Sequence, residues 1–178
     1  MARFDAAVDA WFDQVRGNPV ADRTFYVASA LGDHSLIWFL AGTARALLPG
    51  GDVRDLVELS VSLGVESAIV NLGLKSLFSR ARPVRDDDRP HGLRQPLTSS
   101  FPSGHASAAF VAAALLSDRR PLPEKAFWYA LAGVVSTSRV YVKIHHASDV
   151  AAGAAVGIVL GAAAKRVWRN LLARSGVG

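Results

Sequence analysis

Five mostly apolar segments, separated by polar or proline-rich turns, dominate the chain and limit the folds open to it. These segments are 24–48, 53–78, 105–116, 126–142 and 150–164. None shows the sustained period-two alternation that a half-buried β-strand requires. Ahead of them, residues 4–17 carry apolar side chains at helical spacing and predict an amphipathic helix at a surface or interface. The fold class is therefore expected to be all-α, an antiparallel helical bundle formed by residues 1–178 as a single domain.

The composition indicates a membrane without requiring one. Hydrophobic residues make up 51% of the chain and charged residues 20%, but no segment reaches the roughly 18 uncharged apolar residues typical of a membrane-crossing helix. Gly153, Gly157 and Gly161 form a small-xxx-small pattern that allows close helix packing in a membrane, although a buried alanine-rich helix would show it too. The N-terminus lacks the features of a secretory signal. We interpret the chain as an integral membrane protein with about five transmembrane spans plus the N-terminal amphipathic helix, with a soluble cytosolic protein as the alternative.

The net charge and the cysteine count exclude some partners and catalytic groups but do not identify one. A formal net charge of +5 admits nucleic acid, anionic lipid or phosphorylated small molecules as partners. The chain has no cysteine, which excludes disulfides, thiolate zinc sites and a cysteine nucleophile.

Three clusters of polar residues lie at the ends of the apolar segments. They are Lys75 with Arg82-Pro83, the tetrad "PSGH" at 102–105, and "SRVYVKIHHASDV" at 138–150. Because successive segments of an antiparallel bundle run in opposite directions, all three clusters are expected on one face of the bundle.

The residue types in these clusters suit a phosphoryl group better than any other ligand. Arg82 and Arg139 can each bind phosphate oxygens with two parallel hydrogen bonds, and Lys75 adds a point charge. The Ser103-Gly104 turn at a helix start offers a hydroxyl and free backbone N–H groups, and glycine lets the backbone approach the anion closely.

Two histidines supply candidate catalytic groups. Asp149, four residues after His145, would accept the proton on Nδ1 and leave Nε2 free to attack phosphorus. His105 would protonate the departing oxygen from the other side. This chemistry is expected to need no metal and no cofactor.

The three clusters resemble the signature motifs of the type 2 phosphatidic acid phosphatase superfamily, which also contains bacterial acid phosphatases and vanadium haloperoxidases. The motifs occur in order over residues 75–149, the motif core: Lys, six residues, Arg-Pro; then Pro-Ser-Gly-His; then Ser-Arg, five residues, His, three residues, Asp. The resemblance implies a helical bundle and a phosphohistidine intermediate on His145, with Asp149 orienting it and His105 as general acid. It also implies that the phosphate is held by Lys75, Arg82, Ser103, Gly104 and Arg139.

Several neighbouring residues receive a less specific interpretation. His146 is expected to be a bystander, because adjacent residues do not share a helix face. Arg80, Lys143, Arg85 and Arg94 could widen a basic entrance to the site, but a solvated face is the preferred interpretation for each taken singly. For Asp86, Asp87 and Asp88 a solvated or arginine-paired turn is preferred over a metal site.

The interpretation that follows is a small bacterial membrane-bound lipid phosphatase. Its partners are expected to be the membrane and a lipid phosphate, with no nucleic acid, and no oligomeric state is predicted. The candidate substrates are a polyprenyl phosphate or diphosphate, a phosphatidate and a phosphatidylglycerol phosphate, with the polyprenyl lipids favoured. The alternatives are a vanadate-dependent haloperoxidase-like enzyme and a non-catalytic lipid-phosphate-binding membrane protein.

The distribution of basic residues predicts an orientation in the bacterial plasma membrane. Basic residues gather on the side of the bundle opposite the three clusters, at Arg119, Arg120, Lys125, Lys165, Arg166, Arg169 and Arg174. Since such residues collect on the cytoplasmic side of inserted helices, the active site is expected to face outward.

Overall fold

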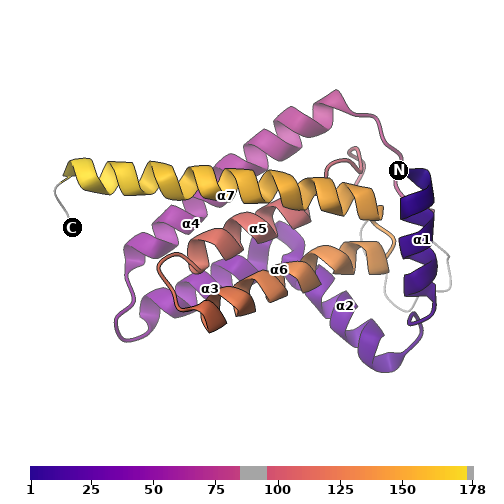
Figure 1. The fold of residues 1–178 in the computed structure, drawn as a ribbon, viewed down its shortest axis with the longest axis horizontal. Helices are drawn as coiled ribbons and strands as arrows, with labels where there is room; N and C mark the ends of the chain where they lie inside the picture. The colour runs from indigo at the N-terminus through magenta and orange to yellow at the C-terminus, as the bar shows by residue number, and fades with distance from the viewer. Residues whose placement is uncertain (85–95, 176–178) are drawn as a thin grey trace.

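The computed structural model describes residues 1–84 and 96–175, and within these ranges it contains helices and no strand (Figure 1). The α-helices are α1 (Ala2–Asp13), α2 (Pro19–Gly32), α3 (Leu36–Leu47), α4 (Val53–Ser67), α5 (Gly104–Leu116), α6 (Leu122–Tyr141) and α7 (Ala147–Ser175). Three short irregular helices join them, namely η1 (Asp33–Ser35), η2 (Ala68–Gly73) and η3 (Leu74–Leu77). The all-α prediction is confirmed.

The central element is α5, which packs against α4, α6 and α7. It is alanine-rich and buried along most of its length, with Ala109, Ala112 and Ala113 fully covered. Small side chains allow its neighbours to approach closely on several sides, so one short helix organises the core of the bundle.

The glycines of α7 form the contact with α5. A Cβ atom at Gly153 or Gly157 would overlap the backbone carbonyl of Ser103 or Ser107, and one at Gly161 would lie 2.7 Å from Ala114 Cβ. The small-xxx-small pattern in the sequence therefore marks a real close approach of two helices.

The bounds of most helices differ from the predicted segments by a few residues, and two differences are larger. Residues 24–48, expected as one run, divide at η1, where His34 and Ser35 have positive φ angles of 51° and 60°. The last helix continues to Ser175 instead of ending near 164, because the lysine and arginines that end the apolar pattern are good helix formers.

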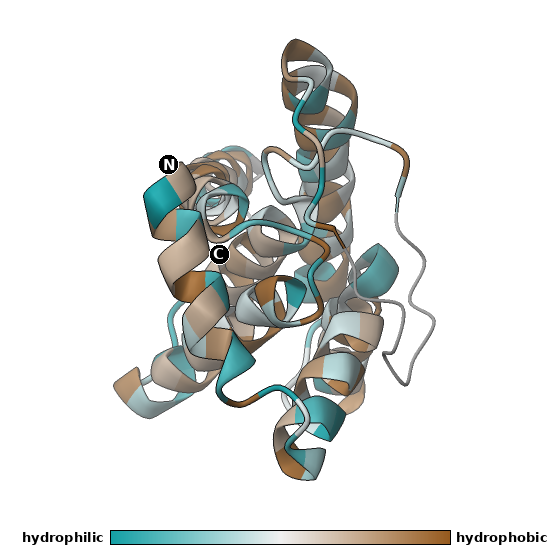
Figure 2. Cartoon of the chain, turned by 90° about the vertical axis from the view of Figure 1, so that its right-hand side faces the viewer, coloured by the Kyte–Doolittle hydropathy of each residue, from teal (hydrophilic) through white to brown (hydrophobic). Residues whose placement is uncertain are grey.

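Among the residues that the structure describes, two helical stretches are long and apolar enough to cross a membrane, Val53–Leu77 and Ala147–Arg174. On α4, exposed Val57, Val61 and Val65 recur every four residues and form an outward apolar stripe. Hydrophobic residues lie along most helices, and hydrophilic residues are frequent at the helix ends (Figure 2). These features fit a transmembrane protein, while the number of about five spans stays a prediction.

Candidate active site

The three polar clusters meet at the end of the bundle where η3 and α6 end and where α5 and α7 begin, next to α1 (Figure 1). The Ser103 backbone N–H donates a hydrogen bond to the Asp149 carbonyl at 3.0 Å and joins the first turns of α5 and α7. Arg82 Nη1 lies 3.3 Å from His145 Nε2. Residues from all three sequence motifs are thus brought into one cluster, as the antiparallel order of the segments requires.

Arg82 is held beside His145 by backbone carbonyls. Its Nη1 donates to the Ile144 carbonyl at 3.0 Å, and its Nε and Nη2 donate to the Thr98 carbonyl at 3.2 and 3.1 Å. The guanidinium is therefore fixed in position before any ligand arrives.

The helix start at "PSGH" has the geometry of an anion site. Ser103 is fully buried, and its hydroxyl caps α5 by accepting the Ala106 N–H. A Cβ atom at Gly104 would lie 3.1 Å from Asn71 Oδ1 and 3.7 Å from Lys75 Nζ, so the lysine ammonium reaches the glycine backbone. The irregular winding of η2 and η3 brings Asn71 and Lys75 to this place, as such π-helical segments often do at functional sites.

Arg139 approaches from the last turn of α6 and is buried. Its Nη1 donates to the Ser29 hydroxyl and lies 3.5 Å from Asp33 Oδ1. A buried guanidinium needs such partners, because its desolvation is otherwise costly.

His145 is a buried imidazole between α6 and α7. Burial lowers the pKa of His145 to about 3, and the nearby positive charges of Arg82 and Arg139 act in the same direction. The ring is therefore neutral at physiological pH, the form in which Nε2 has a lone pair for attack.

Asp149 is fully buried in the first turn of α7. Its Oδ2 accepts the His146 backbone N–H at 2.9 Å and lies 3.6 Å from His145 Nδ1, which is longer than a hydrogen bond. Nδ1 itself makes no hydrogen bond within the part of the chain that the structure describes. Catalytic hydrogen bonds are often long before substrate binds.

His105 contacts a residue that the sequence did not single out as functional. Its Nε2 lies 2.8 Å from Asp33 Oδ1, on η1. The same carboxylate faces both His105 and Arg139. The only sequence signal for Asp33 was a polar break inside an otherwise apolar segment.

Arg80 was interpreted as a solvated side chain, and that interpretation is wrong. Its guanidinium forms ion pairs with Asp5 of α1 and Asp149 of α7, both buried carboxylates. Lys143 instead lies 3.7 Å from carboxylates of Asp9 and Asp13 on α1.

The remaining sequence interpretations concern residues with little or no described geometry. His146 contributes its backbone N–H to Asp149. Arg85, Arg94, Asp86, Asp87 and Asp88 lie outside the described residues. Within 1–84 and 96–175, no group of three or more His, Asp or Glu side chains has the geometry of a metal site.

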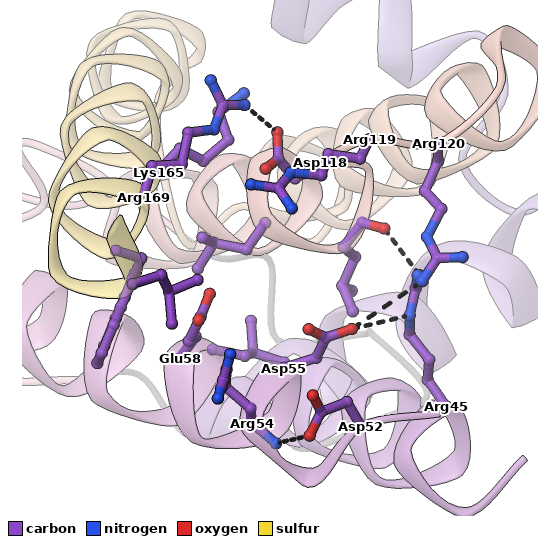
Figure 3. Close-up of a pocket in the computed structure, with 15 residues that line it drawn as sticks. Arg45, Asp52, Arg54, Asp55, Glu58, Asp118, Arg119, Arg120, Lys165 and Arg169 are labelled. Carbon is purple, nitrogen blue, oxygen red and sulfur yellow. Dashed lines mark hydrogen bonds and ion pairs between the residues drawn. The ribbon is translucent and has the colours of Figure 1, made fainter. Parts of the chain in front are cut away.

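A second charged region lies at the opposite end of α7 from Asp149. It surrounds a cavity of about 390 Å³ in which basic and acidic side chains face one another (Figure 3). Arg169 pairs with Asp118 at 2.6 Å, and Arg45 pairs with Asp55 at 3.7 Å. Six basic and four acidic side chains line this cavity, so it carries a small excess of positive charge. The phosphate-binding residues predicted from the sequence all lie elsewhere.

An all-helical bundle that gathers two histidines with lysine and arginine side chains at one end has the groups that a phosphate-handling enzyme needs. Comparison with known proteins gives the family, because residues 55–172 match the PAP2 superfamily. The chain therefore belongs to the PAP2 superfamily and is a phosphatase, which confirms the resemblance seen in its motifs.

Individual relatives agree with this assignment. The decaprenylphosphoryl-5-phosphoribose phosphatase of Mycobacterium tuberculosis is 31% identical over 137 residues, which cover 75% of this chain and 73% of the relative. The crystal structure of Aquifex aeolicus LpxE superposes with a TM-score of 0.72 at 26% identity and covers 90% of this chain and 94% of that chain. A transmembrane PAP2-type phosphatidylglycerolphosphate phosphatase from Bacillus subtilis has the same fold, with a TM-score of 0.69 at 24% identity over 93% and 85% of the two chains.

Proposed function

We propose that the chain is an integral membrane lipid phosphatase that hydrolyses a lipid phosphomonoester or diphosphate through a phosphohistidine on His145, without a metal. The observation that carries the proposal is the position of His145, a neutral buried imidazole with Arg82 at Nε2 and the Asp149 carboxylate on the side of Nδ1. An unprotonated nitrogen beside a fixed cation is what in-line attack on a phosphoryl group needs.

The first chemical step transfers the phosphoryl group to the enzyme. His145 Nε2 forms a bond to phosphorus as the bond from phosphorus to the leaving oxygen breaks, and His105 donates a proton to that oxygen. Asp149 stabilises the positive charge that develops on the His145 ring. Lys75, Arg82, Arg139 and the backbone at Ser103-Gly104 stabilise the equatorial oxygens.

The second step releases phosphate. Water attacks the phosphohistidine, the neutral form of His105 accepts a proton from it, and the nitrogen–phosphorus bond breaks. His145 returns to its neutral form, and His105 is protonated for the next cycle.

Asp33 supports the acid role of His105 in this scheme. Replacing Asp33 with asparagine is expected to lower kcat about tenfold with a smaller change in KM, since the carboxylate stabilises the protonated ring at 2.8 Å and lies farther, at 3.5 Å, from the phosphate-binding Arg139. The loss should grow as pH rises, because without the Asp33 carboxylate the ring of His105 releases its proton more readily. The measurement is kcat and KM across pH.

Making the same substitution in a His105→Gln enzyme tests whether Asp33 acts through His105. In a His105→Gln enzyme, Asp33→Asn should have little further effect, because the two residues act as one unit. An equal loss at every pH, or the same loss in both backgrounds, would contradict the role given to Asp33.

A polyprenyl-linked phosphate is the favoured substrate, and the name of the mycobacterial relative supports it. The test is phosphate release from a panel of polyprenyl phosphates and diphosphates, phosphatidate and phosphatidylglycerol phosphate, with vanadate as inhibitor. Halide oxidation that depends on added vanadate would instead favour the haloperoxidase-like alternative. Inactivity of the folded protein on the whole panel would favour a non-catalytic lipid-phosphate-binding protein.

The outward-facing site in the plasma membrane is supported by the charged cavity at the opposite end, where Arg119, Arg120, Lys165 and Arg169 gather. The chain has no cysteine, so single cysteines can be labelled without background. Leu97→Cys, near the site, is expected to react with a membrane-impermeant maleimide in intact cells, and Lys125→Cys only after permeabilisation. The reverse pattern would place the site in the cytoplasm.

A further inference from the structure

The carboxylate of Asp149 accepts hydrogen bonds from groups other than His145. Arg80 Nη1 donates to Asp149 Oδ1, while the His146 N–H occupies Oδ2. Because the distance from Oδ2 to His145 Nδ1 is 3.6 Å, the orientation of this carboxylate is set by these donors and not by the imidazole.

Arg80 in turn joins Asp149 to the N-terminal helix. Its Nη2 donates to Asp5 Oδ2 at 2.7 Å, and its Nη1 also donates to Ser148 Oγ at 2.7 Å. The guanidinium therefore bridges two buried carboxylates, one on α1 and one on α7, with the rigid fork geometry that arginine provides.

Asp5 also caps α7, although it belongs to a different helix. Its Oδ1 accepts the Ser148 backbone N–H at 2.8 Å, and its Oδ2 accepts the Ser148 hydroxyl at 2.9 Å. Burial alone would raise the pKa of Asp5, but hydrogen bonds from Ser148 and Arg80 outweigh it and lower the pKa. The Asp5 carboxylate is therefore ionised. It lies at the positive end of the α7 helix dipole and contacts Ser148, the residue that precedes Asp149.

We propose that Asp5 is a positioning residue for the reaction: through Arg80 and Ser148, α1 holds the Asp149 carboxylate at the angle from which it orients His145. This proposal rests on the proposed function. It makes the N-terminal helix part of the catalytic apparatus, although α1 contributes no residue to any of the three motifs.

The test is Asp5→Asn, which keeps the size of the side chain and one oxygen to accept the Ser148 backbone N–H, but removes the charge and the second oxygen that hold Arg80. We expect kcat to fall about tenfold or more with KM within about twofold, because Asp149 loses alignment while the phosphate-binding residues stay in place. The matched control is Asp9→Asn on the same helix. Asp9 pairs with Arg16 at 2.6 Å and Lys143 at 3.7 Å, so this control changes the same charge without touching α7.

A double-mutant cycle separates positioning from simple docking of α1. If Asp5 acts through Arg80, adding Asp5→Asn to Arg80→Gln should cost little further activity. Additive losses, or a kcat of Asp5→Asn equal to that of Asp9→Asn, would overturn the proposal. Should Asp5→Asn fail to fold, Arg80→Lys is the alternative test. It keeps the positive charge but loses the two guanidinium nitrogens that donate to Asp149 and Asp5. It is then expected to lower kcat with KM unchanged, and an unchanged kcat would overturn the proposal.

The wild-type enzyme distinguishes this failure from failure of the proposed function. If wild-type protein releases phosphate from a lipid and His145→Ala does not, the function stands whatever Asp5→Asn does. If wild-type protein releases none from the whole panel, the function itself fails.

Discussion

His145→Ala is expected to reduce phosphate release by at least about a thousandfold, because it removes the atom that forms the covalent intermediate. The remaining cationic cluster should still bind phosphate, so vanadate is expected to bind the variant more weakly but measurably. Phosphate release from the best lipid substrate is the direct measurement, and acid-labile, base-stable phosphate on the wild-type protein after rapid quenching is the second.

The neighbouring histidine supplies the control. His146→Ala keeps the backbone N–H that Asp149 accepts and leaves the His145 ring in place, so activity should stay within about twofold of wild type. Equal activity of His145→Ala and wild type would remove His145 as nucleophile. A large loss in His146→Ala would show that the two positions were assigned in the wrong order.

Gly153→Ala is expected to destabilise the protein by about 3 kcal/mol or more, since the new methyl group would overlap the Ser103 carbonyl. A backbone carbonyl cannot rotate away as a side chain could, so α5 and α7 must separate. Activity should fall as well, because Ser103 and Asp149 are joined across this contact. The measurement is the thermal unfolding midpoint in detergent, together with phosphate release.

Gly133→Ala on α6 is the matched control. A Cβ atom there meets nothing within 4 Å, and alanine is a better helix former than glycine by up to about 1 kcal/mol. This variant is expected to be as stable as wild type or slightly more stable. If Gly153→Ala unfolds at the same temperature as Gly133→Ala, the helix contact is looser than the structure indicates.

The fold class and the family could be predicted from the sequence because both depend on local patterns. Helical spacing of apolar residues gave the all-α architecture, and three ordered motifs gave the superfamily. The end of α7 could not be placed, since an apolar pattern marks where a helix is buried and not where it stops.

The sequence patterns did not identify the partners of the motif residues. Asp33, Arg80 and Asp5 owe their positions to tertiary contacts between segments far apart in the chain. For Asp5 a signal did exist: it precedes Val8 and Phe12 by three and seven residues, which places a charge within the apolar stripe of the helix. A carboxylate at such a position stays ionised only with buried partners.

The close contact between α5 and the glycines of α7 limits how the active site can change among related enzymes. The two helix starts that carry Ser103 and Asp149 cannot shift against each other, so the reacting geometry tolerates little variation from one lipid to another. Residues 1–54, which include α1, α2 and α3, precede the matched family region and pack against α4 to α7. A change of lipid preference carried by this region would therefore have to keep Asp5 and Asp33 in place, because Asp5 contacts Arg80 and Asp33 contacts His105 at the site.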